Sequence, residues 1–195
     1  MLASRLLIGE NKMKRILIGA LILAVAATSL AAKPKRAAQA KEAQMKQTEG
    51  KIADKAEFDA ANTFGQGQPN TAYAQYFIGN SFLNPLKIGG GESPVSIANV
   101  TFEPGCRNNW HVHHATKGGG QVIICTAGSG WYQLEGQPAV SMKAGDIAYF
   151  PAGVKHWHGA AADSWFSHLA FELPGENTSN EWLEPVTDDV YSKLK

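Results

Sequence analysis

Three histidines and one glutamine stand where their side chains could bind a metal ion. His111 and His113 are separated by one residue, and in an extended segment two such residues point to the same side of the strand. Gln121 opens the next apolar run, and His156 follows a Pro151-Ala-Gly-Val-Lys segment. Three imidazole nitrogens and one amide oxygen suit a divalent first-row ion such as Mn²⁺, Fe²⁺, Ni²⁺ or Zn²⁺. A six-coordinate ion would keep positions open for water or substrate, as a reactive site requires.

Two further histidines are candidates for proton transfer. His158 lies two residues after His156, so on a strand both side chains lie on the same side. His168 lies within an apolar strand, where a histidine is either a buried core residue or a general acid or base. His114 faces away from His113 on a regular strand, so we do not expect it to be a ligand.

These residues must be positioned by short strands joined by turns. The apolar runs between Tyr73 and Glu172 are short, closely spaced and without a helical period, which predicts a β-sandwich or β-barrel. Gly145 permits a sharp backbone turn, and Pro151 restricts the corner before His156. The expected strands are Tyr73–Ile78, Ser93–Phe102, Gln121–Thr126, Gly130–Leu134, Ala139–Met142, Ile147–Phe150, Lys155–Ala160 and Ser164–Glu172.

The spacing of these residues resembles the two sequence motifs of the cupin superfamily. The resemblance covers about Tyr73 to Glu172 and implies an all-β fold, the double-stranded β-helix or jelly-roll barrel. The matching positions of the first motif are Gly105, His111, His113, Gln121 and Gly128, and those of the second are Gly145, Pro151, Gly153 and His156.

The flanking sequence is similar to the small bacterial cupins with hydroxynitrile lyase activity. The similar runs include Val100-Thr-Phe-Glu-Pro-Gly105, Lys155-His-Trp-His-Gly159 and Ser167-His-Leu-Ala170. This resemblance implies an enzyme that reversibly cleaves a cyanohydrin to a carbonyl compound and cyanide, a small-molecule substrate and a homo-oligomer. It implies manganese as the ion, with ligands His111, His113, Gln121 and His156, and with catalytic residues His158 and His168 nearby.

Two departures from the usual cupin pattern concern Gln121. Many cupins have glutamate at this position, and a glutamine removes one negative charge, so a bound dication keeps more of its Lewis acidity. The gap from His113 to Gln121 is also longer than usual, and we interpret it as a lengthened hairpin. Because one barrel supports many functions, a dioxygenase or decarboxylase-type enzyme and a non-catalytic metal or small-ligand binding module remain alternatives.

The first part of the chain has the pattern of a secretory signal. Met13 is followed by Lys-Arg, an apolar run from Ile16 to Ala27 and small residues up to Ala32. The run is shorter than the about 18 to 20 residues that span a bilayer. We therefore expect a signal peptide within residues 1–32, translation from Met13, and an exported protein, periplasmic or secreted, without a stable membrane span.

The remaining boundaries follow from composition. Residues 33–69 predict a polar helical or disordered linker, in which residues 33–57 have no apolar stripe and residues 58–69 are loop-like. Residues 70–175 predict the barrel, and residues 176–195 a tail in which Thr187-Asp-Asp can start a short helix. A net charge of +1 gives no electrostatic reason to expect nucleic acid. Cys106 and Cys125 are too few for a four-cysteine zinc site, and whether they pair is open. Arg107, beside a turn, is expected at the surface.

Overall fold

The computed structural model describes residues 50–88 and 95–194. The expected signal peptide and the first part of the expected linker lie outside these residues. In the described part no helix is long and apolar enough to cross a membrane. The helices and strands are α2 Lys55–Ala61, β1 Gln68–Pro69, the 3₁₀-helix η1 Thr71–Tyr76, β2 Phe77–Ile78, β3 Ser81–Pro85, β4 Ser96–Phe102, β5 Arg107–Asn108, β6 His111–His114, β7 Lys117–Gly118, β8 Gln121–Leu134, β9 Val140–Lys143, β10 Ile147–Phe150, β11 His156–Ala160, β12 Phe166–Glu172, β13 Gly175–Glu176, β14 Ser179–Trp182 and α3 Asp188–Tyr191.

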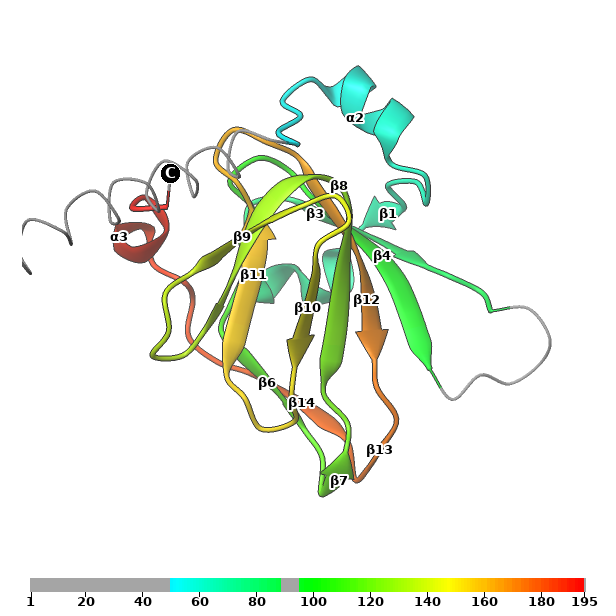
Figure 1. Cartoon of the computed structure of the whole chain (residues 1–195), viewed down its shortest axis with the longest axis vertical. Coiled ribbons are helices and arrows are strands. Elements are labelled where there is room, and N and C mark those ends of the chain that lie inside the picture. The colour runs from blue at the N-terminus through cyan, green and yellow to red at the C-terminus, as the bar shows by residue number, and fades with distance from the viewer. Residues whose placement is uncertain (1–49, 89–94, 195) are drawn as a thin grey trace, which may run out of the picture. The chain divides into compact units, whose positions relative to one another are not determined.

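All described strands except β7 and β13, which pair with each other, form a curled antiparallel sheet around an apolar core, which confirms the all-β jelly-roll expectation (Figure 1). The main path of the sheet runs β1-β3-β4-β12-β8-β11-β5-β2, and β6 pairs with both β11 and β14. Inward side chains of several strands fill the core, as alternation along a half-buried strand requires. Its fully buried members include Phe102, Ile123, Phe150 and Phe166.

The central strand β8 is continuous, whereas the sequence predicts two strands separated near Gly128. Its first half pairs with β10 and β12, and its second half pairs with β9 and β11. Gly128 has φ of 70°, and a Cβ built on it would lie 1.8 Å from the backbone oxygen of Trp165. The glycine therefore lets one strand pass from one side of the barrel to the other where a turn was expected.

The two strands that carry the three candidate histidine ligands lie side by side in register. His156 of β11 is the pairing partner of His111 of β6, and β14 covers the other edge of β6. The two halves of the motif, far apart in sequence, therefore meet through backbone pairing. Strand β14 lies outside the expected barrel limits of 70–175, because its polar sequence lacks the apolar alternation of the other strands.

The prediction of a strand from Tyr73 to Ile78 is wrong, because most of this segment belongs to the 3₁₀-helix η1. In such a helix side chains three residues apart lie above one another. Tyr73 and Tyr76 use this spacing to contact the same ring, that of Trp182, with centroid distances of 6.3 Å and 4.8 Å. The alternating apolar pattern alone did not distinguish the two conformations.

The described end of the expected linker packs on the barrel. Helix α2 begins after Asp54, whose side chain accepts a hydrogen bond from the amide of Glu57. Phe58 is fully buried, and its ring stacks on Trp165 at 5.3 Å. Phe58 follows directly on residues 33–57, which lack an apolar stripe, and this one aromatic residue anchors the short helix to the barrel.

The C-terminal tail ends in the expected short helix α3, which follows Thr187. Arg107 holds this helix and is only 3% exposed, so the expectation of a surface arginine is wrong. Its guanidinium donates to the backbone oxygen of Val186 at 3.0 Å, forms an ion pair with Asp188 and lies over the ring of Tyr191. The desolvated guanidinium is therefore satisfied on several sides.

The two cysteines are free and buried. Burial is the main cause that raises the pKa of Cys106 and that of Cys125 to about 12. Both therefore remain thiols at neutral pH and act as small core residues.

Candidate metal centre

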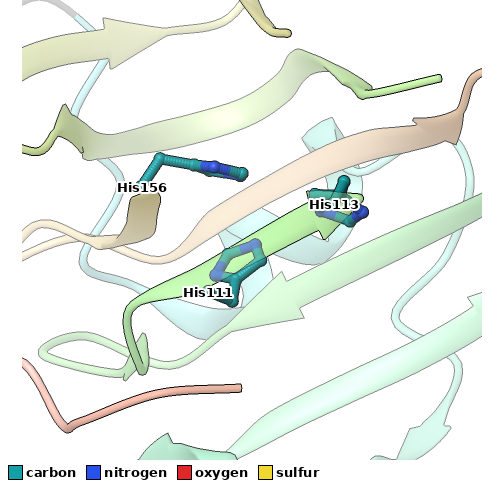
Figure 2. A group of neighbouring side chains, drawn as sticks. All are labelled: His111, His113 and His156. Atoms are coloured by element: carbon teal, nitrogen blue, oxygen red, sulfur yellow. The ribbon is translucent and has the colours of Figure 1, made fainter. Parts of the chain in front are cut away.

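The three predicted histidine ligands converge inside the barrel. His111 and His113 project from β6 and His156 from β11 (Figure 2). One possible ligand atom of each lies within 4.8 Å of those of the other two. The three side chains are buried, so a bound ion would be largely shielded from solvent. The alternation argument therefore places the first pair correctly, and strand pairing adds the third histidine.

Backbone carbonyls orient two of the three imidazoles. The Nδ1–H of His111 donates to the carbonyl oxygen of Asn109 at 3.0 Å, and that of His156 donates to Val154 at 2.9 Å. A carbonyl oxygen only accepts, so the proton is on Nδ1 and the lone pair is on Nε2. Such bonds fix the tautomer that a metal-binding histidine needs.

Gln121 provides a fourth possible ligand atom. Its Nε2 donates to Oε1 of Glu172 at 3.1 Å, while its Oε1 is buried and has no hydrogen-bond partner among the described residues. In the same part of the chain, Nε2 of His113 and Nε2 of His156 are also buried without a hydrogen-bond partner. Unsatisfied buried polar atoms are costly, and a cation is the partner that satisfies several lone pairs together. The residues present therefore fit a divalent ion.

The electrostatics of the centre favour neutral ligands. Burial, followed by the neighbouring histidines, holds the pKa of His111 well below its ordinary value. Burial is also the main cause that lowers the pKa of His156 to about 4. Both rings are neutral at neutral pH, so a metal ion would not have to displace a proton from either.

A cavity of about 240 Å³ opens beside the histidines. His158 lines it and is held from β5, where Asn108 donates its side-chain amide to Nε2 at 3.1 Å and accepts from the His158 backbone amide at 2.9 Å. The cavity is smaller than the about 300 Å³ at which drug-sized ligand pockets begin, so it suits a small molecule. Its apolar lining comprises Tyr73, Phe77, Leu83, Ala98, Val100, Ala170 and Trp182.

His168 lies behind His158 and does not line this cavity. The two ring centroids are 4.7 Å apart in an edge-to-face arrangement, and Phe102 and Phe166 cover the His168 ring. Both ring nitrogens of His168 are buried, and within residues 50–88 and 95–194 neither has a hydrogen-bond partner. Burial lowers its pKa to about 3. The structure therefore brings both predicted proton-transfer residues together, with His158 nearer the cavity. His114, as expected, faces outward and contacts Glu181 at 2.7 Å.

Three residues at the site were not identified from the sequence. Glu172 contacts both His113 and Gln121, Asn108 holds His158, and Trp182 stacks on His111 with ring centroids 4.8 Å apart. Alternation from His168 along β12 would have placed Glu172 on the ligand side. Trp182 belongs to the tail, and no sequence signal places it there.

The residues 98–167 match the family described as Cupin domain. The chain is 40% identical over 120 residues to the (R)-mandelonitrile lyase of Granulicella tundricola, and this alignment covers 62% of the chain and 88% of that relative. The β-barrel, the two sequence motifs and the similarity to this relative all indicate the same family. The chain therefore belongs to the cupin superfamily.

A solved structure with the same fold is a cupin-like protein from Thermotoga maritima. It is 34% identical, its TM-score is 0.59, and the match covers 68% of this chain and 96% of that one. The expected resemblance to cupins of the mandelonitrile lyase kind is thereby confirmed.

The buried neutral His168 predicts a loss of stability in acid. Its pKa is about 3 in the folded protein, against an ordinary value of 6.5, so between these pH values the unfolded chain binds a proton that the folded chain does not. The contribution of His168 is complete above the ordinary value and decreases as the pH falls, by about 1.4 kcal/mol per pH unit.

Urea unfolding of the metal-free protein between about pH 7 and about pH 5 measures this contribution. We expect the free energy of unfolding of the His168→Phe variant to fall less steeply than that of the wild type, by about one proton. Phenylalanine fits the aromatic surroundings of Phe102 and Phe166. Equal slopes in the two proteins would contradict the assignment.

Proposed function

We propose that the chain is a metal-dependent cupin lyase that cleaves a cyanohydrin reversibly into a carbonyl compound and hydrogen cyanide. The observation that carries the proposal is the set of unpartnered ligand atoms on His113, Gln121 and His156, next to His158 at a small, largely apolar cavity. The 40% identity to an (R)-mandelonitrile lyase supports this reaction class over the other chemistries of the fold.

We propose His111, His113, Gln121 and His156 as the ligands of the ion. When bound, a divalent ion would act as a Lewis acid that stabilises negative charge on the substrate oxygen. Manganese is the ion that the family resemblance favours, and iron, nickel and zinc are compatible with the same ligand types.

The reaction needs a proton to leave the hydroxyl group and a proton to reach cyanide as the carbon–carbon bond breaks. We propose that His158 moves this proton, because it is neutral, lines the cavity and is held by Asn108. His168 is proposed as the second residue of the pair, since it contacts the His158 ring. The apolar lining would bind the organic part of the substrate and limit the access of water.

Cyanohydrin synthesis from an aldehyde and cyanide tests the proposal. We expect turnover in the metal-loaded protein, loss of turnover after a chelator, and recovery when the ion is returned. The His158→Ala variant should keep its metal while its kcat falls by about 10² to 10⁴-fold, the usual contribution of a general acid or base. Full metal occupancy without turnover would exclude the lyase assignment, and oxygen uptake with a diketone would then favour an oxygenase.

A further inference from the structure

Glu172 is a carboxylate in contact with two of the proposed ligands. It is the last residue of β12 and the direct cross-strand partner of Gln121, the first residue of β8. Its Oε1 accepts the hydrogen bond from Gln121, and its Oε2 lies 3.0 Å from Nδ1 of His113. The contact between Glu172 and His113 is as short as a hydrogen bond, but its angle does not meet the requirement for one. Its effect is therefore electrostatic.

The hydrogen bond decides which end of the Gln121 amide is available. A side-chain amide has a donating and an accepting end of nearly the same size, and rotation by 180° exchanges them. A carboxylate only accepts, so Glu172 binds the nitrogen and leaves Oε1 of Gln121 for the cation. The NH₂ group alone would be a non-ligand, because its nitrogen has no free lone pair.

The same carboxylate acts on His113. No backbone carbonyl of the residues that the structure describes orients this ring in the way that Asn109 and Val154 orient His111 and His156. The negative charge 3.0 Å from Nδ1 favours the tautomer with its proton there and the lone pair on Nε2. Glu172 thus favours, through its charge, the same tautomer of His113 that main-chain oxygens fix in His111 and His156 through hydrogen bonds.

We propose that Glu172 is a positioning residue of the metal centre, which selects the Gln121 amide orientation and the His113 tautomer and supplies a negative charge beside a neutral ligand set. This inference rests on the proposed metal site, and it does not depend on the reaction that the site catalyses. The chain replaces the glutamate ligand of many cupins by Gln121 and keeps a carboxylate one hydrogen bond farther from the ion.

Titration of the metal-free protein with Mn²⁺ and with Zn²⁺, in competition with a chelator, tests the inference. In the Glu172→Gln variant the side chain at position 172 has only one oxygen. If its NH₂ group faces Gln121, two donors oppose each other, and if its oxygen faces Gln121, the oxygen beside His113 is lost. We expect metal affinity to fall by about 10 to 100-fold, the usual cost of removing a partner of a ligand. The Glu181→Gln variant is the matched control, because Glu181 contacts His114 at the surface, and its affinity should equal that of the wild type.

A double-mutant cycle separates orientation from general effects. In the Gln121→Glu/Glu172→Gln variant, a carboxylate at position 121 accepts from the introduced amide and keeps an oxygen for the ion. We expect the change Gln121→Glu to raise affinity at least about tenfold more in the Glu172→Gln background than in the wild-type background, where it places two carboxylates against each other. The melting temperatures of the metal-free proteins should be similar, since the Glu172 side chain is 42% exposed.

The outcomes distinguish this inference from the proposed function. Wild-type affinity in the Glu172→Gln variant, an equal loss in the Glu181→Gln control, or additive effects in the cycle would overturn it. Metal binding as predicted in all variants, together with no cyanohydrin turnover in the wild type, would overturn the lyase proposal and leave the role of Glu172 intact.

Discussion

Replacing His156 with alanine is expected to lower the affinity for a divalent ion by more than about 100-fold and to abolish turnover. Loss of an outer partner of a ligand already costs about 10 to 100-fold, so the loss of a ligand itself should cost more. His156 is the proposed ligand from the second motif, and its Nε2 is buried with no hydrogen-bond partner in the described part of the chain. The other proposed ligands are His111 and His113 on β6 and Gln121 at the start of β8, so removing His156 takes away the one nitrogen ligand that does not come from β6.

Competition with a chelating dye measures the affinity of the metal-free protein for Mn²⁺ or Zn²⁺. The His114→Ala variant is the control, because His114 lies on the same strand as two ligands but faces outward to Glu181. It should bind the ion as the wild type does. A His156→Ala variant whose affinity stays within about threefold of the wild type would contradict the proposed ligand set.

The Gly128→Ala variant is expected to be largely unfolded. Gly128 combines φ of 70° with a Cβ position 1.8 Å from the carbonyl oxygen of Trp165, so the added methyl group would overlap a backbone atom that cannot move without separating β8 from β12. A left-handed backbone conformation alone costs an L-residue about 1 to 2 kcal/mol. The overlap should raise the total above about 4 kcal/mol, a large part of the stability of an ordinary domain.

Gly136 provides the matched comparison for this substitution. Its φ is 74°, nearly that of Gly128, but a Cβ there would meet no heavy atom within 4 Å. The Gly136→Ala variant should therefore lose only the conformational part, about 1 to 2 kcal/mol. Urea unfolding of both variants gives the difference, and similar losses at the two positions would contradict the account of β8.

The sequence predicts correctly several of the strands that are short apolar runs bounded by turn residues. Strand β10 has the predicted limits, and β11 begins one residue later than predicted. The pair His111 and His113 follows from the alternation of side chains along a strand. The convergence of His156 with this pair does not follow from periodicity, because it depends on the pairing of β11 with β6, and the family motifs supplied that expectation.

Other features depend on contacts between segments that are distant in sequence. In the sequence, Phe58 and Arg107 stand among mainly polar residues, and nothing local predicts their burial. Phe58 is buried because it packs on Trp165, and Arg107 because it binds the segment that begins α3. Glu172 ends a predicted strand, yet its role requires knowledge that β12 and β8 pair in the register that opposes it to Gln121. Strand pairing belongs to the tertiary structure, and a local sequence pattern does not predict it.

Elemental analysis of the purified protein, compared with its His111→Ala variant, tests the central claim most directly. His111 is buried, and its Nδ1 donates a hydrogen bond to the carbonyl oxygen of Asn109. Its possible ligand atom lies within 4.8 Å of those of His113 and His156. The account predicts about one divalent ion per wild-type chain and almost none in a variant that remains folded. The same metal in the same amount in both proteins would contradict it.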